Sequence, residues 1–137
     1  MGHEWFHNLR SGGIPRELAA GIRARVFPGE HVMLSVVELE PWSESPVHSH
    51  PQEQWGVCLE GAWIRIQDGQ EHPVKAGDFW QTPPHVPHGG RTLGERCVIL
   101  DIFAPPREEY RRSGSGLGAA TLAPRPAGPI DASAGAR

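Results

Sequence analysis

The sequence is broken by turn-forming residues at short intervals. Among 137 residues it has 14 Pro and 17 Gly, and because both residue types interrupt helices, the spacing excludes long helices. The one helical candidate is Pro15–Ala20, where a proline opens a short run suited to a first helical turn. We therefore expect a short helix or turn near the N-terminus and strands in the rest of the fold.

Between the turns, apolar and β-branched residues form short runs that are typical of strands. The Asp68-Gly69 pair predicts a two-residue hairpin turn between two of them. Strands of this length and spacing, without alternating helices, predict an all-β antiparallel sandwich or barrel. The predicted strands are Ile22–Phe27, His31–Glu40, Gln54–Glu60, Ala62–Gln67, Glu71–Lys75, Phe79–Thr82 and Arg96–Phe103.

The chain has the length of one domain. We place this domain at residues 21–112, after an N-terminal arm at residues 1–20. Residues 113–137 are mostly Gly, Ala, Ser and Pro with few large apolar side chains. Because such a segment buries too little to offset its ordering entropy, we predict a disordered tail there.

Composition narrows the function classes. No apolar run approaches the roughly 20 residues that span a bilayer, and no apolar segment follows Met1 as in a secretory signal. A net charge of -3 argues against binding to nucleic acid or anionic membranes, which needs a basic excess. Two cysteines make no disulfide framework. We expect a cytoplasmic protein that acts on a small molecule.

Histidines give the strongest functional signal. His48 and His50 are two residues apart, so in a strand both side chains lie on one face and can reach one ion. His88 follows a second turn rich in glycine and proline, which would bring a distant strand beside the first. Three neutral imidazoles suit a divalent first-row metal. The alternative is a pair of surface histidines on a polar strand.

The fourth ligand has two candidates. Gln54 lies four residues beyond His50 and so keeps the same strand face, whereas Glu53 has the opposite parity. Pro51 could introduce a bulge that exchanges the two. His85 would face elsewhere or lie behind the ligands. The remaining histidines lack partners at ligand spacing and are expected on the surface: His3, His7, His31 and His72.

The last predicted strand carries one acid among apolar residues. Alternation places Asp101 on the same face as Cys97, Ile99 and Phe103, opposite to Val98, Leu100 and Ile102. If that face lines the interior, Asp101 is a carboxylate in a mostly apolar cavity, suited to general acid or base work. The alternative is a structural aspartate that caps a loop or pairs with an arginine.

Two arginines are candidates for the same cavity. Arg107 follows the stiff Pro105-Pro106 segment and could hold a substrate carboxylate in bidentate fashion. Its alternative is a surface ion pair with Glu108 or Glu109. Arg65 alternates with Trp63 and Gln67, so these three side chains are expected at the cavity mouth.

Two segments resemble the motifs of the cupin family. HSHPQEQWGVCLEG, residues 48–61, resembles the first motif, and GDFWQTPPHVPH, residues 77–88, resembles the second. The resemblance covers roughly residues 20–112 and implies a double-stranded β-helix, or jelly-roll barrel. It also implies one divalent Zn, Ni, Mn or Fe ion and a homodimer formed through an outer sheet face. Two positions depart from the family pattern: Gln54 replaces the usual glutamate, and His85 the usual glycine.

A narrower resemblance lies in DIFAPPREEY, residues 101–110, together with FPGEHVML upstream. It is similar to the small pectin-degradation cupins, which open 4,5-unsaturated uronates to the linear keto form. This implies metal ligation by His48, His50, Gln54 and His88. It implies working roles for Asp101, Phe103 and Arg107.

Four neutral ligands leave a metal its full dipositive charge, which favours an anionic substrate and non-redox isomerase or lyase chemistry. Similar sequences also occur in cupins of other activity. The rival enzymes are a metal-dependent dioxygenase and a polyketide-cyclase-like cupin. The rival from another class is a non-catalytic module that binds a sugar acid or a metal.

Overall fold

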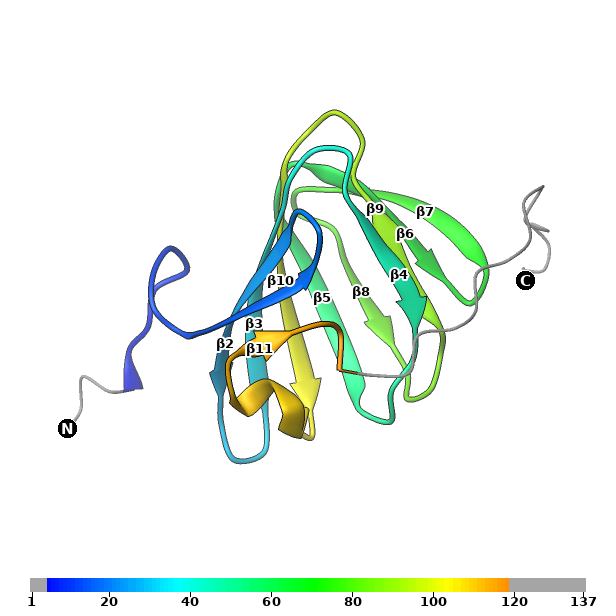
Figure 1. Cartoon of the computed structure of the whole chain (residues 1–137). Helices are drawn as coiled ribbons and strands as arrows, with labels where there is room; N and C mark the ends of the chain where they lie inside the picture. Colours follow the sequence, from blue (N-terminus) through cyan, green and yellow to red (C-terminus); the bar gives the residue numbers. More distant parts are fainter. Residues whose placement is uncertain (1–4, 119–137) are drawn as a thin grey trace.

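The computed structural model describes residues 5–118 and arranges their strands in two facing sheets (Figure 1). The larger sheet has seven strands in the order β11-β1-β2-β3-β10-β5-β8, and the smaller has four in the order β4-β9-β6-β7. All neighbours pair antiparallel except β1 and β11, which pair parallel. The larger sheet comprises β1 (Ile14–Ala19), β2 (Ile22–Pro28), β3 (Met33–Leu39), β5 (Glu53–Glu60), β8 (Phe79–Thr82), β10 (Cys97–Ala104) and β11 (Gly114–Ser115).

The smaller sheet contains two strands that the sequence pattern did not predict. Its members are β4 (Glu44–His48), β6 (Ala62–Gln67), β7 (Gln70–Lys75) and β9 (His88–Arg91). Of these, β4 and β9 are short and contain proline, glycine and histidine in place of an apolar alternation. The predicted all-β architecture is confirmed.

The predicted helix at Pro15–Ala20 is wrong. Residues Ile14–Ala19 form β1, which pairs with β2 from Ile14 opposite Val26 to Ala19 opposite Ile22. Gly21, at a φ of 79°, makes the turn between the two strands. Pairing with β2 satisfies the backbone groups of β1 and places Ile14 and Leu18 against the core. This pairing outweighs the local helix signal of the proline.

The fold extends beyond residues 21–112 at both ends. At the C-terminal end, β11 pairs with β1, and the Arg16 guanidinium donates hydrogen bonds to the carbonyls of Glu109, Ser115 and Gly116. Leu117 is buried at 8% exposure. The first residues of the predicted tail therefore belong to the fold, and residues 119–137 of that prediction lie outside the described residues.

The core lies between the two sheets. Along β2 the alternating residues Ile22, Ala24 and Val26 are buried, as expected for a strand with one face on the core. Gly56 in β5 leaves room for an aromatic side chain, because a Cβ there would lie 2.5 Å from the Trp80 indole. The other buried apolar members include Met33, Val37, Leu39, Cys58, Trp63, Cys97, Ile99, Phe103 and Tyr110.

The two cysteines are free and buried in this core. Their sulfur atoms lie 3.8 Å apart. Burial raises the pKa of both thiols, so they stay protonated and unreactive.

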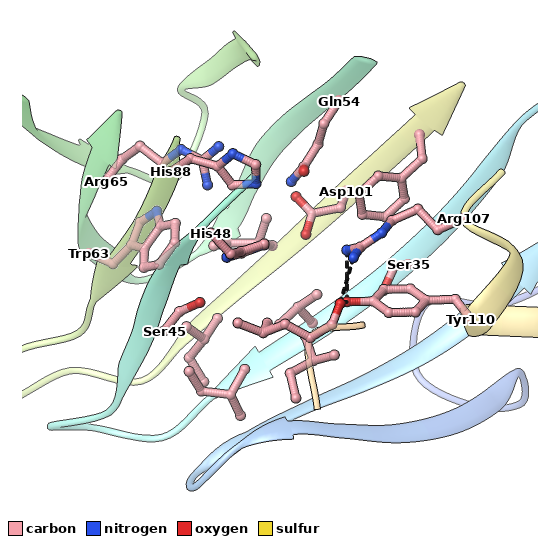
Figure 2. Close-up of a pocket in the computed structure, with 17 residues that line it drawn as sticks. Ser35, Ser45, His48, Gln54, Trp63, Arg65, His88, Asp101, Arg107 and Tyr110 are labelled. Carbon is pink, nitrogen blue, oxygen red and sulfur yellow. Dashed lines mark hydrogen bonds between the residues drawn. The ribbon is translucent and has the colours of Figure 1, made fainter. Parts of the chain in front are cut away.

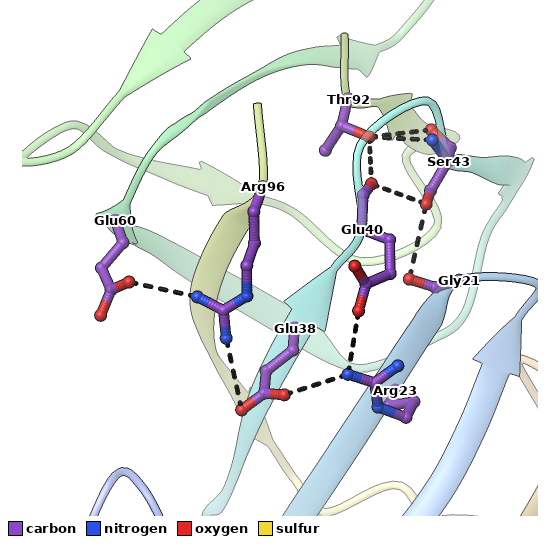
Figure 3. Close-up of polar contacts among 8 residues, drawn as sticks. All are labelled: Gly21, Arg23, Glu38, Glu40, Ser43, Glu60, Thr92 and Arg96. Carbon is purple, nitrogen blue, oxygen red and sulfur yellow. Dashed lines mark hydrogen bonds and ion pairs between the residues drawn. The ribbon is translucent and has the colours of Figure 1, made fainter. Parts of the chain in front are cut away.

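A polar cluster joins the sheets at one end (Figure 3). The Ser43 hydroxyl donates to the carbonyl of Glu40 at 2.7 Å and lies 3.4 Å from that of Gly21. The Thr92 hydroxyl donates to the Glu40 carbonyl at 2.6 Å and accepts from the Ser43 backbone N–H at 2.9 Å. These bonds fix the loop that leads from β3 to β4, and so they help to determine the position of His48, the last residue of β4.

The outer face of the larger sheet carries exposed apolar side chains. Leu34, Trp55 and Phe79 are 38%, 39% and 67% exposed. Beside them lies an exposed row of ion pairs formed by Arg23, Glu38, Arg96 and Glu60 (Figure 3). The homodimer expected through an outer sheet face stays a prediction. Within the described residues, no helix is long and apolar enough to cross a membrane.

Candidate metal centre

Three histidines from separate parts of the chain converge inside the fold. His48 ends β4, His88 begins β9, and the two residues pair directly between these strands. His50 lies two residues after His48, beyond the end of β4, and still faces the same point. One ring nitrogen of each lies within 4.8 Å of the others, and the residues are 5%, 5% and 2% exposed. The predicted convergence is confirmed.

Backbone carbonyls fix the protonation of the three rings. Because a carbonyl oxygen only accepts, each Nδ1 that bonds to one must carry the proton, which leaves the lone pair of a neutral ring on Nε2. The His88 Nε2 is buried and has no hydrogen-bond partner among the described residues. The carbonyl partners are Pro46 for His48 at 2.9 Å, Gln52 for His50 at 3.1 Å and Val86 for His88 at 2.8 Å.

Burial also keeps the rings neutral. Burial, with a smaller contribution from the charge of Arg107, lowers the pKa of His48 and of His50 to about 4. The pKa of His88 is lowered still more, by burial and then by the charge of Arg65. Neutral imidazoles with free Nε2 lone pairs are the form in which histidine binds a metal.

Gln54 completes the set. It is 4% exposed, and its Oε1 lies 2.9 Å from the His50 Nε2. Both atoms carry lone pairs, and two acceptors cannot form a hydrogen bond with each other. A cation bound to both atoms would account for their short separation. Glu53 lies on the other strand face, where its carboxylate accepts bonds from Trp55 and Gln81. The residues present therefore fit a divalent cation with three imidazole nitrogens and one amide oxygen as ligands.

Asp101 faces the same cavity. As predicted, Ile99, Asp101 and Phe103 on β10 line it together with His48 and His88, and Figure 2 shows the carboxylate between the histidines and Arg107. Burial raises the pKa of Asp101 to about 6. The charges of Arg65 and Arg107 and a hydrogen bond from Gln54 oppose this rise without cancelling it. The acid can therefore take up and release a proton near neutral pH.

Arg107 is buried, so the alternative of a surface residue is wrong, although the ion pair with Glu109 is present. The residue is 1% exposed and lies over the Tyr110 ring, 4.2 Å from its centroid. Its Nη1 donates to the Tyr110 hydroxyl at 2.9 Å (Figure 2), and its Nη2 donates to the Leu117 carbonyl. Glu109 lies 3.6 Å away. Both terminal nitrogens are thus engaged within the protein, and Nε alone has no partner in the described part of the chain.

Arg65 and Trp63 line the cavity from β6, as predicted. Arg65 is 4% exposed and donates to the Thr82 hydroxyl at 2.8 Å and to Gln67 Oε1 at 3.2 Å. Gln67 contacts Arg65 but does not line the cavity as predicted. It lines an adjoining surface groove. His85, at a φ of 69°, is exposed, and its side chain does not belong to the histidine cluster.

Sequence reasoning missed several cavity residues. Ser35, whose partner in the sheet is Asp101, is buried, and its hydroxyl has no hydrogen-bond partner in residues 5–118. The sequence feature that could have identified Ser35 is its position as a polar residue within an apolar strand. Tyr110 and Leu117 also line the cavity, and no sequence signal marks them, because they reach it only after the chain turns back beyond β10.

Comparisons with known proteins show which sequences this chain is similar to. The family profile described as "Cupin domain" matches residues 35–103. The chain is 24% identical over 96 residues to the pectin degradation protein KdgF of Dickeya dadantii, covering 69% of this chain and 87% of that protein. It is 27% identical over 100 residues to the H2HPP isomerase of Bacillus subtilis, covering 72% of this chain and 42% of that protein.

A solved structure supports the same fold. An RmlC-like cupin from Shewanella frigidimarina superposes with a TM-score of 0.66 and 25% identity, covering 72% of this chain and 88% of that one. The expected double-stranded β-helix is therefore confirmed.

Proposed function

This chain belongs to the cupin domain family, and from that premise we propose that it is a metal-dependent isomerase or lyase acting on a small oxygenated anion. The favoured reaction is the opening of a 4,5-unsaturated uronate ring to its linear keto form. The similarity to a pectin degradation protein and to an isomerase supports this class of chemistry.

The observation that carries the proposal is the position of Asp101. A carboxylate with a pKa of about 6 lies in one cavity with the neutral imidazoles of His48 and His88, Gln54 and two buried guanidinium groups, and His50 belongs to the same histidine cluster. A divalent cation bound to His48, His50, His88 and Gln54 would act there as a Lewis acid toward a substrate oxygen. The guanidinium groups add positive charge that favours an anionic substrate.

Asp101 would move the proton. Its carboxylate takes the proton from the C1 hydroxyl of the closed ring, and the electron pair of that O–H bond forms the C1 carbonyl as the C1–O5 bond breaks. The electron pair of the C1–O5 bond passes to O5 and leaves a C5 enolate, which becomes a ketone when the Asp101 carboxyl delivers the same proton to C4. No electrons leave the substrate, so the reaction needs no oxidant.

Phe103 and Arg107 would shape the site. Phe103 packs against the His50 ring at 5.7 Å between centroids and against the Tyr110 ring at 5.9 Å. The Arg107 guanidinium lies 5.4 Å from the Phe103 centroid and keeps one unpartnered N–H, on Nε, among the described residues. This N–H can donate to a substrate oxygen.

The test compares turnover of 4,5-unsaturated uronates by wild type and by Asp101→Asn, with metal content measured on both. The unsaturated ring absorbs in the ultraviolet, and its opening removes that absorption. We expect Asp101→Asn to keep its metal and to lose turnover by about 100-fold or more. Asp68→Asn is the matched control, since Asp68 is exposed at a turn with a φ of 53° that asparagine tolerates.

Unchanged turnover by a metal-bearing Asp101→Asn variant would contradict the assigned role. Consumption of oxygen coupled to substrate loss would favour a dioxygenase and contradict the non-redox reaction. Tight binding of the uronate to metal-loaded wild type without turnover would favour a non-catalytic binding module.

A further inference from the structure

Arg65 is a buried cation that contacts no acid directly within residues 5–118, and the opposing charge that acts on it is that of Asp101 in the same cavity. Its two hydrogen bonds go to neutral acceptors, the Thr82 hydroxyl and the Gln67 amide oxygen. Within residues 5–118 the guanidinium makes no ion pair, and its third nitrogen, Nη1, has no hydrogen-bond partner. Burying an arginine is costly unless an anion compensates the charge. The arrangement is that of a site prepared for an anionic ligand.

Arg107 is less suited than Arg65 to bind a carboxylate. Both of its terminal nitrogens are held by Tyr110 and Leu117, whereas a carboxylate is recognised through two parallel N–H bonds. In Arg65, by contrast, Nη1 has no hydrogen-bond partner within residues 5–118, and Nη2 donates only to the neutral Thr82 hydroxyl.

Arg65 lies between two spaces of different size. It lines the interior cavity of about 40 Å³ and a surface groove of about 540 Å³ beside β6, β7 and β8. Small-molecule sites measure about 300–1,000 Å³. The groove therefore has room for the body of a small organic acid, and among the described residues Arg65 lines both spaces.

The surroundings favour a ring. The indoles of Trp63 and Trp80 flank the guanidinium, with centroids 5.9 Å and 5.5 Å from its central carbon, and Phe79 lines the groove at 67% exposure. Trp80 and Phe79 line the groove, whereas Trp63 is 5% exposed and lines the metal cavity. Flat apolar surfaces such as Trp80 and Phe79 pack against a sugar or aromatic ring. The one acid in the groove, Asp78, accepts the Lys75 N–H at 2.9 Å and lies 4.0 Å from its ammonium, so its charge is partly compensated.

We propose that Arg65 binds the carboxylate of a ring-shaped organic acid at the point where the metal cavity adjoins the groove beside β6, β7 and β8. The assignment rests on the proposed function and refines it, because it names the residue that recognises the acid group of the substrate. Arg107 then holds the C-terminal segment in place and offers the substrate only its Nε N–H.

The first test measures binding of D-glucuronate, with D-glucose as the neutral comparison, to the full chain by calorimetry. We expect Arg65→Gln to weaken glucuronate binding by about 10- to 100-fold and Arg65→Lys to weaken it less. Arg91→Gln is the matched control, because Arg91 is on the surface and pairs with Glu71. Equal binding of glucuronate and glucose by wild type, or unchanged binding by Arg65→Gln, would overturn the assignment.

The second test needs no variant and so does not depend on the folding of Arg65→Gln. Glucuronate is titrated into wild type while the tryptophan indole N–H signals are followed by NMR. The indoles of Trp63 and Trp80, which flank Arg65, should shift. Trp42, which is 76% exposed and outside both spaces, should not. Shifts confined to other tryptophans, or no shift at any concentration, would overturn the proposal.

These outcomes separate this proposal from the proposed function. Binding that depends on Arg65 with no turnover of unsaturated uronates by metal-loaded protein would leave the carboxylate site standing and remove the reaction. Turnover that survives Arg65→Gln with unchanged KM would leave the reaction standing and remove the role of Arg65.

Discussion

Acid should destabilise the metal-free protein, because its buried histidines are neutral. In the unfolded chain an imidazole has a pKa near 6.5, whereas burial lowers the pKa of His48 and of His50 to about 4 in the fold. Between these values the unfolded state binds more protons than the folded state. The free energy of unfolding therefore falls as the pH is lowered from 6.5 to 4.

The magnitude follows from the same values. Each of the two histidines contributes a loss of about 3 kcal/mol over this range, and the lowered pKa of His88 acts in the same direction. Asp101 acts in the opposite direction. Its pKa, raised from 3.8 to about 6, lets the folded state bind the extra proton first, so acidification regains about 3 kcal/mol. A net loss of at least about 3 kcal/mol remains.

The assay is guanidinium unfolding of EDTA-treated protein at pH 7, 6, 5 and 4.5, followed by tryptophan fluorescence. The unfolding midpoint should fall with pH. Asp101→Asn removes the opposing contribution and should steepen the fall, and His48→Gln should reduce it. His31→Gln is the matched control, since the His31 side chain is 86% exposed. A midpoint that stays constant or rises from pH 7 to 4.5 would refute the reasoning.

Two substitutions test the packing around the site. Tyr110→Phe removes a buried hydroxyl that donates to the Leu117 carbonyl at 2.8 Å, and urea unfolding should show a loss of about 1–3 kcal/mol; an unchanged midpoint would show that this contact does not stabilise the C-terminal segment. Gly56→Val would force a side chain against the Trp80 indole and should cost about 1–3 kcal/mol with a changed near-ultraviolet circular dichroism spectrum. Gly94→Ala, where the nearest atom lies 3.5 Å from the new Cβ, should have neither effect, and equal behaviour of the two glycine variants would contradict the packing argument.

Local patterns in the sequence predict the features that depend on neighbouring residues. Glycine and proline turns predicted most strand positions, and the spacing of His48 and His50 predicted their shared direction. The parity of residues 97–103 predicted that Asp101 faces the interior, because alternation is a property of the strand itself. Each of these features is determined by residues within one segment of the chain.

Features that depend on distant segments could not be predicted in the same way. Ile14–Ala19 forms a strand because β2 and β11 lie beside it, and nothing within the segment records this. The engagement of Arg107 by Tyr110 and Leu117 depends on how the chain turns after β10. The choice between Gln54 and Glu53 likewise needed the three-dimensional course of the chain after Pro51.

The most direct test of the central claim is the metal content of the protein. Elemental mass spectrometry on tag-free protein should find about one divalent ion per chain in wild type. His88→Ala, which removes a buried ring with a free Nε2, should lose it, whereas His72→Ala on the exposed strand β7 should keep it. Wild type that holds no metal even after loading, or a His88→Ala variant that keeps its metal, would contradict the assignment of this cluster as a metal centre.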